Sequence, residues 1–187
     1  DANRATILVE LNLDGKDRER FYGTTRPSRT KISGIPGLIS EAELNQSLSE
    51  HALGFSVLSV GPLLANRGAD QAIAPLFSML TKRYSYILID LPVEADPSVL
   101  KSLTQSDLIY LMADQHRDNV TLTRAFLHKM LNALPHGDQR IKVVVNRMSG
   151  IGLPVSLEEI GHELGVPVAY VLPRASSTAA PLTPEEI

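Results

Sequence analysis

Short apolar runs alternate along this chain with longer segments whose apolar residues recur at helical spacing. The runs predict strands at 5–11, 55–60, 86–91, 107–113, 141–146 and 168–172. The helical spacing predicts helices at 17–22, 41–49, 68–83, 98–105, 119–134 and 157–164, and the stretch 24–37 is predicted to be a loop. Strands that alternate with helices predict an α/β fold, a doubly wound and mostly parallel sheet with helices on both faces.

Several predicted helices carry clear start and stop signals. Ser40 is followed three positions later by Glu43, and Ser156 by Glu159, so both pairs match a capping box. Asp96-Pro97 combines a helix-capping side chain with a proline that suits the first helical position. Gly165 is placed to end the last helix.

The run Tyr84 to Pro92 predicts a buried, central parallel strand with Asp90 at its carboxyl end. Ligands of open α/β sheets bind along that edge. Asp90 has two interpretations: a cap for the following turn, or a carboxylate that holds a Mg²⁺-bound water in a nucleotide site. Other polar residues also follow strands, namely Glu10, Asn12 and Asn146.

Composition narrows the function classes only a little. The 187 residues carry a net charge of −3, so no nucleic-acid partner is indicated. The chain contains no cysteine, which excludes disulfides and thiolate metal sites, and no apolar run of membrane-spanning length. We expect one domain over residues 1–187. The absent initiator methionine and the helix start at Thr183-Pro184 lead us to expect that it is truncated at both ends of a larger polypeptide.

Five phrases in order resemble the MinD/ParA group of P-loop ATPases, whose relatives include CpaE-type pilus-assembly ATPases and bacterial tyrosine kinases. Ile7–Asp14 is similar to the family's "VLLVDLDL", and Gly54–Pro62 to its "GLDVLPAGP". Tyr84–Pro92 is similar to "YDYVLIDLPP", the Walker B strand. Val143–Arg147 resembles "LVLNR", and Leu157–Pro173 resembles "LEEIEEALGLPVLATLP".

The resemblance implies roles for individual residues. Asp90 matches the Walker B aspartate, which holds Mg²⁺ through water. Glu10 and Asn12 match the two acidic positions that orient attacking water. The nucleotide-binding positions implied are Asn146, which matches the adenine-reading asparagine, and Arg147 directly after it. Pro173 and Arg174 fall where the family's backbone packs beside the base. ATP and Mg²⁺ are therefore the implied ligands, provided that the parent polypeptide has a phosphate loop.

The departures from the family pattern concern hydrolysis. Residues 1–187 contain no G-x-x-x-x-G-K-S/T motif, which in the family precedes the strand at 5–11. Asn12 cannot act as a carboxylate, and Glu94 stands where the family usually has a glycine facing the γ-phosphate. We expect hydrolysis to be weak or lost.

Two functions remain open from the sequence. One is a cytoplasmic, bacterial ATP-dependent positioning or regulatory switch that acts as a homodimer or with a partner protein. The other is a degenerate, non-catalytic MinD-like module for protein interaction or dimerisation within a larger protein. A Rossmann dinucleotide enzyme is disfavoured because no G-x-G-x-x-G follows a first strand.

Overall fold

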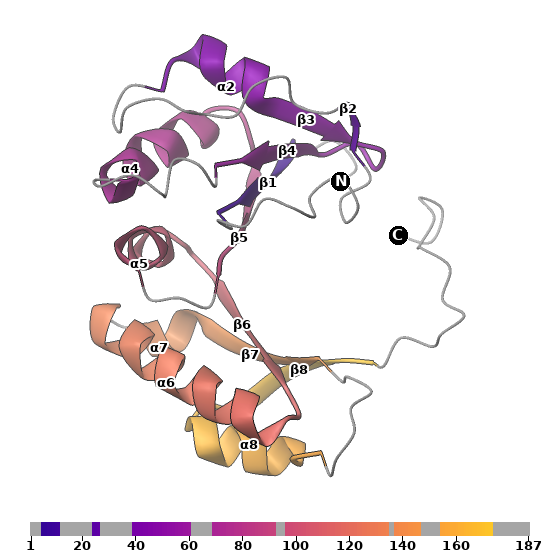
Figure 1. The fold of residues 1–187 in the computed structure, drawn as a ribbon, viewed down its shortest axis with the longest axis vertical. Helices are drawn as coiled ribbons and strands as arrows, with labels where there is room; N and C mark the ends of the chain where they lie inside the picture. Colours follow the sequence, from indigo (N-terminus) through magenta and orange to yellow (C-terminus); the bar gives the residue numbers. More distant parts are fainter. Residues whose placement is uncertain are drawn as a thin grey trace. The chain divides into compact units, whose positions relative to one another are not determined.

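A computed structural model describes residues 5–11, 24–26, 39–60, 69–92, 96–134, 137–146 and 154–173. The chain forms two compact units, Asp1–Ser102 and Leu103–Ile187, so the boundary lies within helix α5. In Figure 1 the first unit runs from indigo to magenta, and the second from red to yellow.

The first unit is built on a five-stranded sheet in the order β2-β3-β4-β1-β5 (Figure 1). Strands β4, β1 and β5 are parallel to one another, whereas β3 is antiparallel to both of its neighbours, β4 and β2. Its elements are β1 (Thr6–Glu10), β2 (Thr24–Arg26), α2 (Glu41–Ser47), β3 (Leu48–His51), β4 (Ser56–Ser59), α4 (Ala69–Leu80), β5 (Tyr86–Asp90) and α5 (Pro97–Thr104).

The core of the first unit lies between this sheet and its helices. Helix α4 contributes Ile73, Leu76 and Leu80, all fully buried, to one apolar cluster with the strand residues Ile7 and Val9. Side chains alternate between the faces of a strand, so Leu8 lies on the opposite face from Ile7 and Val9. Burial of the α4 stripe fixes which face of β1 is turned to the core.

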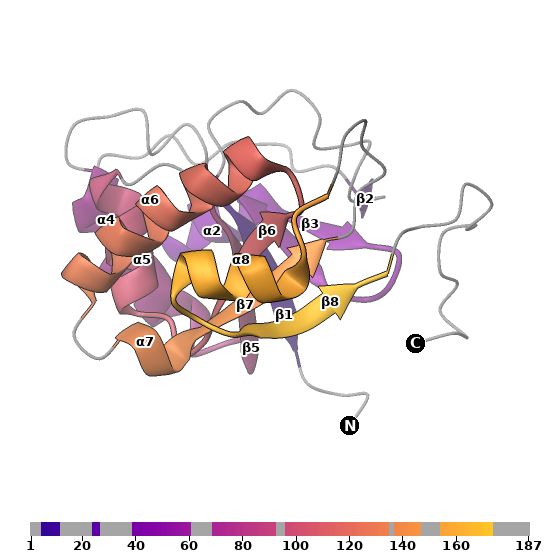
Figure 2. The same cartoon turned by 90° about the horizontal axis from the view of Figure 1, so that it is seen from below.

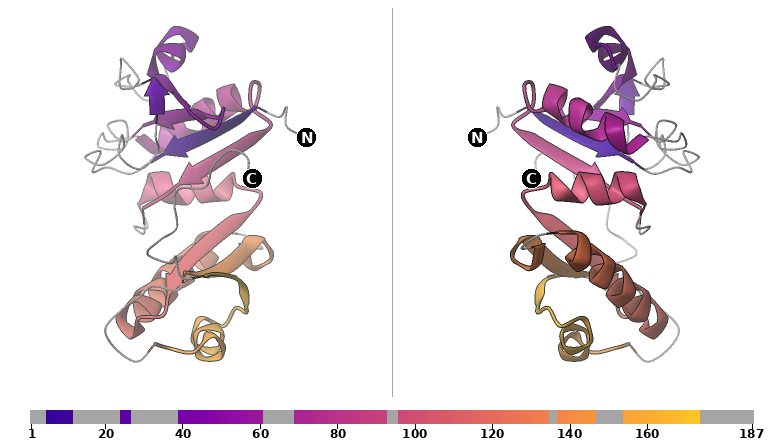
Figure 3. Two further views of the ribbon diagram at one scale, coloured as in Figure 1. Left: turned by 90° about the vertical axis from the view of Figure 1, so that its right-hand side faces the viewer. Right: turned by 90° about the vertical axis from the view of Figure 1, so that its left-hand side faces the viewer.

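Strand β5 differs from the prediction of a buried central strand. Among the described residues it pairs only with β1, at the end of the five-stranded sheet, and its own residues alternate between exposed and half-buried (Figure 3, where β1 and β5 lie side by side). The side chains of Tyr86 and Leu88 are 52% and 55% exposed. The prediction was wrong because apolar sequence indicates what a strand can bury, but not whether the described residues supply its neighbour.

The second unit is a three-stranded parallel sheet in the order β6-β7-β8 (Figure 2). Helices α6 and α8 pack against each other, α6 also against β6 and α8 against β8. Buried residues of α6 and α8, such as Val120, Leu127 and Ile160, face this packing. The elements are β6 (Ile109–Asp114), α6 (Arg117–Ala133), α7 (Gly137–Arg140), β7 (Ile141–Asn146), α8 (Leu157–Leu164) and β8 (Val168–Leu172).

The predicted helix signals are present. The Glu43 N–H donates to Ser40 Oγ at 3.2 Å and the Ser40 N–H donates to Glu43 Oε2 at 2.9 Å, which completes the capping box of α2. Asp96 Oδ1 accepts the N–H groups of Ser98 and Val99 at the start of α5. Gly165 ends α8 with φ +69°, a left-handed conformation that glycine adopts without the Cβ clash.

The α/β class and the mostly parallel pairing are confirmed, while some local predictions were wrong. The helix predicted to reach residue 49 ends at Ser47, and β3 follows because a turn at Gly54, with φ +82°, folds it back onto β4. Strand β2 falls within the predicted loop, and α7 was not predicted. The helix predicted at 17–22 lies outside the described residues.

No helix in the described part of the chain combines the length and the apolar character needed to cross a membrane.

Candidate functional site

Three polar residues end neighbouring parallel strands of the first unit. Glu10 on β1 is the register partner of Ser59 on β4 and of Asp90 on β5. Backbone hydrogen bonds fix this alignment: the Leu11 N–H donates to the Asp90 carbonyl at 3.0 Å, and the Val60 N–H donates to the Glu10 carbonyl at 3.0 Å. Residues in register on parallel strands share a face, so the Glu10 and Asp90 side chains lie on one face at the carboxyl edge.

The two carboxylates differ in their access to solvent. Asp90 is exposed, whereas Glu10 is only 6% exposed. An exposed carboxylate at a sheet edge can hold a hydrated Mg²⁺, because this ion keeps several waters and needs only one or two protein carboxylates. A buried carboxylate is poorly placed to orient a water that must attack a bound ligand.

The second unit has its own polar edge, on which Asn146 ends β7. Asn146 is in register with Asp114 on β6 and with Leu172 on β8. The asparagine is exposed, and so is Pro173, which directly follows Leu172. The second sheet therefore brings the predicted residues Asn146 and Pro173 onto neighbouring strands at one edge.

Asp114 is a strand-end aspartate that the sequence reasoning did not single out, although it directly follows the predicted strand 107–113. Its Oδ1 accepts the N–H of His116 at 2.8 Å, and its Oδ2 accepts from Asn119 Nδ2 at 2.7 Å. These bonds organise the start of α6 and occupy both oxygens. Asp114 therefore has the capping role that was one of the two interpretations of Asp90.

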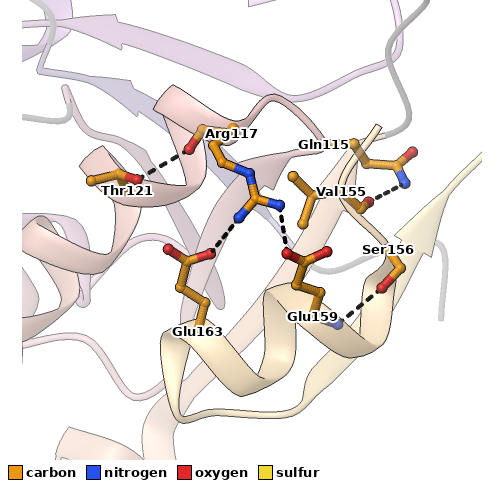
Figure 4. Close-up of polar contacts among 7 residues, drawn as sticks. All are labelled: Gln115, Arg117, Thr121, Val155, Ser156, Glu159 and Glu163. Carbon is orange, nitrogen blue, oxygen red and sulfur yellow. Dashed lines mark hydrogen bonds and ion pairs between the residues drawn. The ribbon is translucent and has the colours of Figure 1, made fainter. Parts of the chain in front are cut away.

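The start of α6 is tied to the start of α8, as Figure 4 shows. The Val155 N–H donates to the Gln115 carbonyl, and Gln115 Nε2 donates to the Val155 carbonyl, both at 2.9 Å. Arg117 on α6 pairs with Glu159 and, at 3.7 Å, with Glu163 on α8. The hydrogen bond to Glu159 raises the pKa of Arg117, so this cation stays charged. The two helices that flank the Asn146 edge are thus joined at one end.

Asn12, Glu94, Arg147 and Arg174 lie outside the described residues. Among the described residues Glu10 and Asp90 come together in the first unit, and Asn146 and Pro173 in the second.

A self-contained metal site is not present in the part of the chain that the structure describes. No group of three or more His, Asp or Glu side chains is arranged to hold an ion there. Asp90 fits Mg²⁺ as one ligand among water and phosphate oxygens. The described donor set does not fit a structural ion held by protein groups alone, such as Zn²⁺.

Comparison with known proteins gives a structural match without a sequence match. No family model matches the chain, and no curated protein matches it. A ParA family ATPase from Chlorobium tepidum TLS has a TM-score of 0.73 at 14% identity, over 92% of this chain and 72% of that chain.

Two MinD structures are similar to a comparable extent. MinD from Pyrococcus horikoshii OT3, the septum site-determining protein complexed with Mg-ADP, has a TM-score of 0.66 at 15% identity, over 92% of this chain and 70% of that one. The Aquifex aeolicus MinC:MinD complex gives 0.66 at 14% identity, over 91% and 69%. The chain therefore has the fold of the MinD and ParA ATPases.

Proposed function

We propose that this chain is the nucleotide-binding part of a MinD/ParA-like switch that binds ATP with Mg²⁺ and hydrolyses it weakly or not at all. In this proposal residues 1–187 are a single domain, truncated from a larger polypeptide that supplies the phosphate loop. The switch acts in the bacterial cytoplasm as a homodimer or with a partner protein.

The observation that carries the proposal is the exposed Asp90 at the carboxyl edge of the parallel strands β4, β1 and β5 in a MinD/ParA-like fold. Asp90 would hold a water of Mg²⁺. Asn146 would read adenine, Arg147 would contribute to nucleotide binding, and Pro173 and Arg174 would lie beside the base. A similar structure, that of Pyrococcus horikoshii MinD, is a complex with Mg-ADP, which supports this choice of ligand.

Bound Mg²⁺ would supply charge neutralisation to the phosphates, and the residues of this chain would position it. Asp90 can accept hydrogen bonds from metal-bound water at an edge that solvent reaches. Glu10, buried on the neighbouring strand, would lie close to the ion without entering its coordination sphere. The Asn146 side chain has both N–H donors and a carbonyl acceptor, the combination that the adenine edge needs.

Calorimetric titration of ATP into the natural full-length polypeptide tests this proposal. We expect saturable binding in the presence of Mg²⁺, with ATP turnover far below the ordinary enzyme range of about 1 s⁻¹ and above. A full-length polypeptide that shows no heat of binding at ATP concentrations up to about 1 mM, a Kd equivalent to about −4 kcal/mol, would overturn it.

A second candidate is a degenerate module that serves protein interaction or dimerisation without nucleotide. The burial of Glu10 favours it, because a carboxylate that is 6% exposed cannot readily orient water. Asn12 and Glu94 stand where a working ATPase usually has a carboxylate and a glycine. This candidate expects an Asp90→Ala variant to assemble normally; loss of assembly in that variant, with the fold intact, would count against it.

A further inference from the structure

Two consecutive residues at the end of β6 hold two separate segments of the second unit. Asp114, the last residue of β6, is the register partner of Asn146 at the end of β7. Gln115, which follows it directly, is hydrogen-bonded to Val155, the residue before the N-cap of α8. The end of β7 and the start of α8 are therefore both attached to one short stretch of chain.

The attachment of Val155 uses both of its backbone polar groups. Its N–H donates to the Gln115 carbonyl at 2.9 Å, and its carbonyl accepts from Gln115 Nε2 at 2.9 Å, the contact drawn in Figure 4. Val155 is only 3% exposed, so water has little access to it. Because a buried carbonyl that loses its donor raises the free energy of the fold, the Gln115 side chain stabilises this position of the chain.

The turn that carries Gln115 is also fixed from α6. The Asp114 carboxylate accepts hydrogen bonds from the His116 N–H and from the side chain of Asn119. The residues on either side of Gln115 are thus joined to each other. The Gln115 side chain extends from a turn that is already held in place, so it loses little further backbone entropy in reaching Val155.

Asn146 depends on its neighbouring strand ends for its own position. It is exposed at the end of β7, so burial does not fix its side chain as it fixes the inner residues of the strand. Its register partners are Asp114 and Leu172. A side chain that recognises a ligand must be held within about 0.5 Å of its productive geometry by the groups around it. Gln115 secures one of the two strand ends that support Asn146.

We propose that Gln115 is a positioning residue for the nucleotide-binding edge of the second unit. By bonding to Val155 it holds the end of β6 against the start of α8, and so keeps Asn146 in place to read adenine. The inference rests on the proposed function, because Asn146 has a base to read only if this chain binds ATP. No sequence motif indicates this role, since the bond joins residues 40 positions apart.

A double-mutant cycle on the natural full-length polypeptide tests the inference by calorimetric titration of ATP with Mg²⁺. Gln115→Met keeps the length of the side chain but removes its N–H donors. We expect it to weaken ATP binding about fivefold when Asn146 is present, and by less than about twofold in an Asn146→Ala background. Equal losses in the two backgrounds would mean a general structural role and would overturn the proposal. The absence of any loss would overturn it as well.

Arg117→Met is the matched control, because it removes the other link between α6 and α8, the ion pairs to Glu159 and Glu163. We expect ATP binding to change by less than about twofold in this variant. A loss as large as that of Gln115→Met would show that binding depends on helix contact in general, against the proposal. A wild-type polypeptide that does not bind ATP would refute the proposed function and the inference together, whereas binding without the expected coupling refutes the inference alone.

Amide hydrogen exchange without nucleotide tests the physical step separately. The Val155 N–H should exchange about tenfold or more faster in Gln115→Met than in the wild type, because the start of α8 opens more often once the Val155 carbonyl has lost its donor. The N–H of the buried Val143 on β7 should change by less than about twofold, which shows that the variant is folded. Unchanged exchange at Val155 would overturn the proposal. Gln115→Glu, which also lacks an N–H donor at neutral pH, replaces Gln115→Met in every measurement if that variant does not fold.

Discussion

Glu10 and Asp90 are register partners on adjacent parallel strands, and the residue after Glu10 donates its N–H to the Asp90 carbonyl at 3.0 Å. One carboxylate is buried and the other is exposed. Only Asp90 can contact a ligand that arrives from solvent. The two carboxylates therefore cannot substitute for one another, and variants of Glu10 and of Asp90 should have different effects.

Asn146 is expected to discriminate between bases. Asn146→Ala should weaken ATP binding by the full-length polypeptide about tenfold, since one or two hydrogen bonds to the adenine edge are lost. Binding of GTP, whose edge has the opposite donor and acceptor pattern, should change little. The control is Lys142→Ala, an exposed position on the same strand far from the carboxyl end. Equal losses for ATP and GTP would contradict the assignment.

The capping box of α2 should depend on pH through the carboxyl group of Glu43. Hydrogen bonds from the Ser40 N–H, and then from its hydroxyl, lower the pKa of Glu43 below its usual 4.5. A lowered acid pKa in the fold means that the contribution to stability is complete above pH 4.5 and is lost as the pH falls through the folded-state pKa.

The amide resonance of Ser40, followed by NMR from pH 6 to pH 2 at about one-unit steps, measures this titration. Its midpoint should lie below 4.5. In Glu43→Gln the glutamine can still accept from Ser40, so the box should persist without the transition. A wild-type midpoint at or above 4.5 would disagree with the structure.

The Arg117–Glu159 pair should contribute little to stability. Both side chains are about half exposed, at 60% and 47%. A double-mutant cycle with Arg117→Ala and Glu159→Ala should give only a small coupling in chemical denaturation, and this coupling should shrink further in 1 M salt, where the Debye length is about 3 Å. A large coupling that 1 M salt leaves unchanged would mean that the pair is shielded from solvent.

The buried side chain of Leu76 should contribute strongly to the stability of the first unit. Its side chain is fully buried in the cluster with Ile7 and Val9, so Leu76→Ala should lower the free energy of unfolding by about 2–5 kcal/mol. The exposed Leu122→Ala is the matched control, with an expected change within about 0.5 kcal/mol. Hydrogen exchange of the β1 amides, measured at increasing urea concentrations, reports the free energy of unfolding of this unit. Similar decreases for the two variants would contradict the assignment of Leu76 to the core.

Much of the fold could be predicted because local chemistry dictates it. The bonds of Ser40, Asp96 and Ser156 to the first N–H groups of their helices are short-range and depend on residue type and spacing. The β-branched run at 141–146 forms a parallel strand as predicted, with four of its six residues buried. Features of this kind depend only on residues that are close together in the sequence.

What could not be predicted depends on non-local pairing. Leu48–His51 continues a helical apolar pattern, yet it becomes β3 because β4 lies beside it after the turn at Gly54. The exposure of β5 depends on whether another strand lies beside it, and the sequence of β5 alone does not determine this. At the candidate site the sequence located the strand-end residues Asp90 and Asn146, but neither the burial of Glu10 nor the capping role of Asp114 could be read from residue types.

The central claim, that Asp90 positions Mg²⁺ beside a bound nucleotide, is tested most directly by titrating ATP with and without Mg²⁺ into three full-length proteins: wild type, Asp90→Asn and Asp114→Asn. Asp114 is the matched control because it also ends a parallel strand, but its oxygens are engaged by His116 and Asn119. We predict that Mg²⁺ strengthens ATP binding about tenfold or more in wild type and Asp114→Asn, and not in Asp90→Asn. An unchanged Mg²⁺ dependence in Asp90→Asn would contradict the account.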